Sequence, residues 1–126
     1  DARRARTDSG FEVTTHGGRE SAGIDALAWV EKACALGVGE ILLTSVDREG
    51  TRQGFDVELV RLISESVSVP VIASGVLRTA QDFVSVIKET SVDAVAIADA
   101  FHYRRLNVND IREAAKSHGI RVRHYA

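Results

Sequence analysis

Apolar residues recur along the chain at two periods, one typical of helices and one typical of buried strands. The helical period predicts four helices, each bounded by residues with capping chemistry. The first has apolar positions at 26, 29, 30 and 33 and ends at Gly37. The others begin after Asp56, Thr79 and Asn107, whose side chains can accept hydrogen bonds from a first helical turn, and the last ends at Gly119.

Short apolar runs lie between these helices. Residues 40–45, 69–73 and 92–98 predict three strands that are apolar on both faces. Strands of this kind joined by helices predict an α/β fold with a parallel sheet and right-handed crossovers, and the short repeat is typical of a (β/α) barrel. Before the first helix, residues 11–15 alternate weakly after a turn-like segment at 7–10, which predicts a small hairpin.

The composition fits one soluble domain and excludes several classes of partner. The 126 residues are 44% hydrophobic, and 16 Lys and Arg against 18 Asp and Glu give a net charge of −2. We therefore expect no nucleic-acid partner, and no membrane partner because no apolar run approaches the roughly 18 residues of a membrane span. The single cysteine, Cys34, fits a reducing cytoplasm, and no spacing of His, Cys and carboxylates suggests a metal. The chain contains no methionine, so we expect it to be a piece of a longer protein.

Polar residues and glycines lie at the end of each predicted strand or just after it. They are Thr44, Ser45 and Asp47 for the first, Ser74 and Gly75 for the second, and Asp99 for the third. In parallel α/β folds the carboxyl ends of the strands share one edge, where ligands bind. Gly50-Thr51 and Ser74-Gly75 can offer backbone N–H groups and hydroxyls to a phosphate. The alternative is that each of these residues caps a helix or makes a turn.

Three segments carry a resemblance to a known family. They are GEILLTSVDREGT at residues 39–51, PVIASG at residues 70–75 and Phe101-His102. Together they resemble the C-terminal half of the cyclase subunit of imidazole glycerol phosphate synthase, an enzyme of histidine biosynthesis. The resemblance implies that residues 1–126 form half of a (β/α)8 barrel, from the end of the fifth unit through the eighth, without the N-terminal half.

The resemblance also implies a reaction and its partners. The family closes an imidazole ring on a bis-phosphorylated ribonucleotide, using ammonia from a glutaminase subunit, and forms imidazole glycerol phosphate and aminoimidazole carboxamide ribonucleotide. Two aspartates serve as acid and base, as ring closure needs proton transfers at separate atoms. The opening Asp1-Ala2-Arg3-Arg4 matches the end of the family's fifth strand, which makes Asp1 the catalytic carboxylate of this half. No cofactor is implied.

Other positions correspond to the family's substrate and ammonia sites. Glu40 matches a charged residue at the ammonia entrance, although a solvated residue at a strand start is the simpler interpretation. The positions implied to bind substrate or its phosphates are Thr44, Asp47, Glu49, Gly50, Thr51, Ser74, Gly75, Ala98 and Asp99.

The chain departs from the family's usual pattern at three positions. Glu49 replaces an aspartate, Val76 replaces a glycine, and Asp99 replaces a serine. A side chain at position 76 restricts the backbone, and a carboxylate at position 99 repels a phosphate. Arg78 or Arg104 is expected to offset the charge of Asp99.

Four functions therefore remain open. They are half of the cyclase, a cyclase paralogue with an altered substrate, a protein like the phosphoribosyl isomerase of the same pathway, and a non-catalytic half-barrel module. A half barrel exposes sheet edges and an apolar inner face. We therefore expect the chain to pair with an N-terminal half-barrel or with a second copy of itself as a homodimer.

Overall fold

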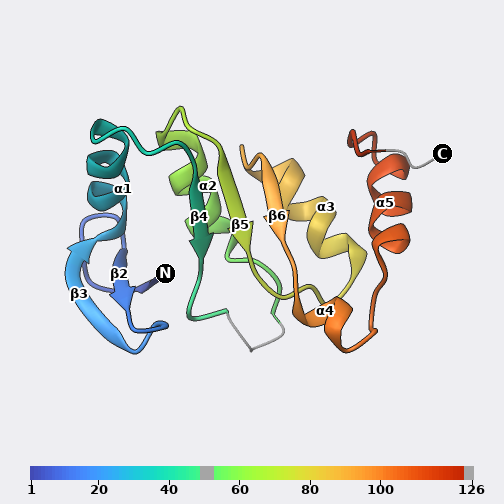
Figure 1. Ribbon diagram of the computed structural model, residues 1–126, viewed down its shortest axis with the longest axis horizontal. Helices are drawn as coiled ribbons and strands as arrows, with labels where there is room; N and C mark the ends of the chain where they lie inside the picture. Colours follow the sequence, from blue (N-terminus) through green and yellow to red (C-terminus); the bar gives the residue numbers. More distant parts are fainter. Residues whose placement is uncertain (49–52, 124–126) are drawn as a thin grey trace.

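The computed structural model describes residues 1–48 and 53–123. In these residues the chain forms two three-stranded sheets and five helices, arranged along the molecule in chain order (Figure 1). The first sheet is antiparallel, with order β1-β2-β3. Its strands are β1 (Ala2–Arg4), β2 (Phe11–Thr15) and β3 (Glu20–Asp25). The predicted hairpin is thus confirmed as β1 and β2, while β3 was not predicted because its residues lack an alternating pattern.

The second sheet is the predicted parallel one, with order β4-β5-β6. Its strands are β4 (Ile41–Thr44), β5 (Val71–Ser74) and β6 (Ala94–Ala96). Ala2 forms an isolated parallel bridge with Ser45, so β1 lies beside the end of β4. The α/β class and the parallel sheet are therefore confirmed, although β6 is shorter than the predicted run of residues 92–98.

The four predicted helices are all present. They are α1 (Ala26–Ala35), α2 (Val57–Ser66), α3 (Ala80–Glu89) and α5 (Val108–Ser117). Asp56 and Asn107 accept hydrogen bonds from Leu59 and Asp110, as their capping chemistry predicts. A short helix, α4 (Asp99–His102), follows β6 and was not predicted, since four residues are too few to show a period.

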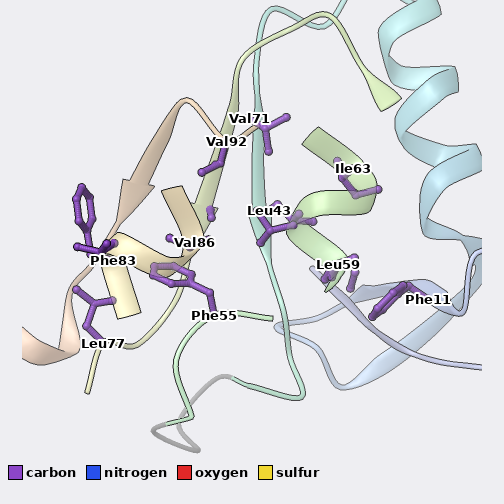
Figure 2. Close-up of a cluster of buried hydrophobic side chains, with 14 of the residues drawn as sticks. Phe11, Leu43, Phe55, Leu59, Ile63, Val71, Leu77, Phe83, Val86 and Val92 are labelled. Carbon is purple, nitrogen blue, oxygen red and sulfur yellow. The ribbon is translucent and has the colours of Figure 1, made fainter. Parts of the chain in front are cut away.

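The core lies between the parallel sheet and helices α2 and α3. Leu43 of β4 and Val71 of β5 point to this side, where they pack with Leu59 and Ile63 of α2 (Figure 2). The alternate positions Leu42 and Ala94 are exposed, and Leu42 is 61% exposed. The sheet therefore has a covered face, which packs on helices, and an open face, which carries Leu42, Thr44, Ile72, Ser74, Ala94 and Ala96.

Candidate functional site

The carboxyl ends of β4, β5 and β6 meet at one edge of the molecule, the edge that carries α4 in Figure 1. A cavity of about 270 Å³ lies there, and its walls include five of the predicted site residues. These five are Thr44, Ser74, Gly75, Ala98 and Asp99. The remaining wall is Val76, Ala96 and Ile97. Residues at the ends of three separate strands are thus brought into one pocket, as expected for ligand sites of parallel sheets.

The register of the strands explains why these side chains converge. Thr44 pairs with Ser74, which pairs with Ala96, so the three form one layer across the open face. Leu42, Ile72 and Ala94 form the next layer toward the amino ends of the strands. The pocket therefore has a hydroxyl-bearing floor above an apolar layer.

Gly75 offers the pocket no free amide, and its missing side chain makes room for the Phe55 ring of the core. Its N–H donates to the carbonyl of Ala96 at 3.2 Å, which joins the ends of β5 and β6. A Cβ at this position would lie 2.9 Å from Cδ1 of the Phe55 ring. Glycine is required here because the aromatic ring of the core packs directly against the backbone.

Asp99 is neutralised by a neighbouring arginine. Its carboxylate binds the Arg105 guanidinium, and Arg105 also lies over the Tyr103 ring. The expectation that Arg78 or Arg104 offsets this charge was wrong. Arg78 instead binds Asp82 on α3, with Nη2 and Oδ1 2.8 Å apart. Arg105 follows α4, and a loop of this kind gives no periodic signal from which its direction could be inferred.

Asp47 has a different partner from the other predicted site residues. Its Oδ2 accepts the backbone N–H of Arg4 at 2.6 Å, and it is absent from the pocket wall. The structure thus separates Asp47 from the five residues that line the pocket. Glu49, Gly50 and Thr51, the remaining predicted phosphate-binding residues, lie outside the described part of the chain.

Asp1 and Glu40 line a second cavity of about 230 Å³, along the edge of β4 and beside α1. Most of its wall is apolar and includes Trp29 and Val30. Asp1 lies near the carboxyl end of β4, because the next residue bridges Ser45, whereas Glu40 precedes the strand. At the rise of a strand they are separated by roughly 13 Å along β4.

Arg4, Asp56 and Glu58 form an ionic cluster that the site prediction did not include. The Arg4 Nη2 lies 3.2 Å from Asp56 Oδ1 and 2.8 Å from Glu58 Oε2. The hydrogen bond to Glu58 raises the pKa of Arg4 above its ordinary value, so the guanidinium stays charged. Of these three residues, only Asp56 has a recognisable sequence pattern, which is that of a helix cap.

Among residues 1–48 and 53–123, no group of three His, Cys, Asp or Glu side chains is placed to hold a metal ion. Over the same residues, each helix is too short or too polar to cross a membrane.

Comparison with known proteins shows the family to which this chain belongs. Residues 1–107 match a family model described as histidine biosynthesis protein. The chain is 50% identical over 127 residues to imidazole glycerol phosphate synthase subunit HisF of Bifidobacterium longum, which covers 98% of this chain and 49% of that protein. It is 49% identical over 124 residues to the subunit of the same name from a Nocardioides species, with 98% and 48% covered. The chain thus spans about half the length of the curated relatives it matches.

Proposed function

Because this chain belongs to the histidine biosynthesis protein family and is similar to HisF subunits, we propose that it is the C-terminal half of a cyclase. The complete enzyme forms imidazole glycerol phosphate and aminoimidazole carboxamide ribonucleotide from a bis-phosphorylated ribonucleotide and ammonia. The observation that supports this most is the pocket at the carboxyl ends of β4, β5 and β6. The hydroxyls of Thr44 and Ser74 suit one phosphate-bearing end of the substrate.

Asp1 supplies one of the two proton-transferring carboxylates in this proposal. It is exposed, and the segment that carries it lies beside the end of β4, near the Thr44 layer. Ring closure needs an acid and a base at separate atoms, so the second carboxylate comes from the N-terminal half.

Ammonia reaches this centre along the open face. Residues 40, 42 and 44 lie on the same side of β4, which places Glu40 before the strand, then Leu42, then Thr44. A charged residue followed by an apolar layer fits an entrance to a dry passage. A glutaminase subunit, bound at the Glu40 end, supplies the ammonia.

The barrel is completed by a second half. The open face exposes Leu42, and β4 and β6 are the outer strands of the parallel sheet as described. An N-terminal half-barrel covers this face in the active enzyme, and without it a second copy of the chain takes that place. Light scattering at micromolar concentration checks this: a monomer contradicts it, and Leu42→Arg weakens the dimer.

A cyclase paralogue with a changed substrate is the second candidate. The observation that favours it is the pocket wall itself, where buried Val76 and the Asp99–Arg105 ion pair stand in place of the glycine and serine usual in the family. The test is the double variant Val76→Gly with Asp99→Ser. It tightens binding of the bis-phosphorylated ribonucleotide if these residues weaken the phosphate site.

The cyclase proposal is tested by complementation. The chain is mixed with the N-terminal half of a HisF relative, and ring closure is followed with an ammonium salt as nitrogen source. Asp1→Asn lowers the rate about 10²-fold or more, as expected for loss of a general acid or base. Asp8→Asn, an exposed aspartate in the β1–β2 turn, is the matched control and keeps the rate. Failure of the reconstituted barrel to bind the bis-phosphorylated ribonucleotide in calorimetry refutes the cyclase assignment.

A further inference from the structure

The short β1 strand, which follows Asp1, is bound to the segment after β4 through backbone groups. The Val46 N–H donates to the Ala2 carbonyl at 2.8 Å, and the Arg4 N–H donates to Asp47 Oδ2 at 2.6 Å. With the parallel bridge between Ala2 and Ser45, these contacts fix the height of β1 relative to β4.

The Arg4 side chain extends the attachment to α2. Its guanidinium binds Asp56 and Glu58, and its Cζ lies 5.0 Å from the centre of the Phe11 ring. The Asp56 side chain is only 1% exposed and also accepts the Leu59 N–H at the start of α2. Burying a carboxylate is costly unless it is paired and hydrogen-bonded, so Arg4 offsets part of the cost of burying Asp56.

Arg4 therefore contacts three parts of the fold at once: the segment after β4 through its amide, the start of α2 through its guanidinium, and β2 through Phe11. Asp1 lies three residues before Arg4, immediately before β1. The backbone carbonyl of Asp1 accepts the Thr14 N–H at 2.9 Å, and Asp1 as a whole is exposed. The direction of this strand thus determines where the Asp1 carboxylate stands.

We propose that Arg4 is a positioning residue that holds Asp1 in place at the carboxyl end of β4. Its effect on catalysis rests on the proposed function, since it acts through Asp1 and contacts no substrate. A carboxylate that transfers protons must be held close to one geometry, and a shift of about 1 Å reduces rates by roughly 10²-fold.

Hydrogen exchange on the chain itself tests the positioning without any enzyme assay. The reporters are the amides of Arg4 and Val46, and the Gly75 amide, bonded to Ala96, reports overall stability. Arg4→Met speeds exchange at both reporters about tenfold or more, with Gly75 unchanged. Arg4→Lys gives a smaller change, because an ammonium retains the charge but not the fork of donors. The matched control is Arg61→Met, which removes a surface arginine that binds Glu89. Equal exchange in Arg4→Met and the control overturns the proposal.

Kinetics of the complemented barrel then test the link to Asp1. Arg4→Met lowers kcat about 10- to 100-fold and changes KM little, because Asp1 is displaced while the phosphate pocket stays intact. In an Asp1→Asn background the same change adds less than about threefold, since residues that act through one group are not additive. Effects that multiply in the double variant overturn the proposal. If the unsubstituted barrel closes no ring, the cyclase assignment fails, and the exchange rates alone decide whether Arg4 positions the strand.

Discussion

The two faces of the parallel sheet are built from neighbouring residues and serve different ends. On the covered face, Leu43 and Val71 are buried against α2 and α3, as Figure 2 shows for the labelled core residues. On the open face, Leu42 is as apolar as Leu43 but stands exposed. The covered face thus supplies the core of the chain, while the open face is left exposed among the described residues. A strand that is apolar on both faces is normally buried on both, and the described part of this chain covers only one of them.

The largest effect on stability is expected when the same substitution, leucine to alanine, is compared on the two sides of the sheet. Leu59, on α2 against the covered face, is fully buried, and Leu59→Ala destabilises the chain by about 2–5 kcal/mol through the cavity it leaves. Leu42→Ala on the open face is the control. Denaturant unfolding measures both at a protein concentration low enough to dissociate the dimer, and equal losses would show that the open face is packed even in the monomer.

Gly75→Ala tests how tightly the pocket wall joins the core. The new Cβ lies 2.9 Å from the Phe55 ring, so the ring must move, at an expected cost of about 1–3 kcal/mol. Gly39→Ala is the matched control, since its Cβ meets no atom within 4 Å among the described residues. Thermal unfolding compares the two variants, and a cost no larger than that of Gly39→Ala contradicts the tight contact.

The stability of the covered face is expected to depend on pH through Asp82, at the start of α3. Burial raises the pKa of Asp82, but hydrogen bonds from the Arg78 side chain and from the amides of Arg78 and Thr79 hold it below its ordinary value. Because the unfolded chain binds this proton more readily, the stability that the carboxylate contributes is present above about pH 4 and is lost as the pH falls further.

Asp82→Asn therefore costs about 1 kcal/mol at neutral pH and gives a shallower loss of stability below pH 4. Unfolding in denaturant at a series of pH values measures this slope. Asp8→Asn is the control, and a slope equal to that of the unsubstituted chain would rule out a role for Asp82 in acid stability.

The smallest effect is expected at a polar exception on the covered face. The Ser45 hydroxyl is buried and has no hydrogen-bond partner in residues 1–48 and 53–123. Ser45→Ala removes a polar group that gains nothing from burial, so stability stays within about 0.5 kcal/mol or rises slightly. Chemical denaturation detects this, and a loss above 1 kcal/mol would reveal a partner for the hydroxyl.

The residues of the candidate site were predictable where the positions of the strand ends alone bring them together. Thr44 and Ser74 end their strands and Asp99 follows one. Parallel strands bring their carboxyl ends together, so the meeting of these residues in one pocket follows from the order of elements. Asp47 also follows a strand, but its carboxylate is taken by the Arg4 amide. Arg105 was missed in favour of Arg78 and Arg104, because all three are arginines close to Asp99 in the predicted topology.

The sequence by itself determined the four long helices and the three parallel strands of this protein. Helix caps such as Asp56 and Asn107 act within three residues, and the apolar period of each helix and strand is local, so neither depends on the rest of the chain. Only the tertiary structure decided which charges meet. Arg4 and Asp56 are 52 residues apart in the sequence, and they meet because β1 is placed beside β4. The direction of a long side chain at the end of a strand is set by neighbours that the local pattern does not contain.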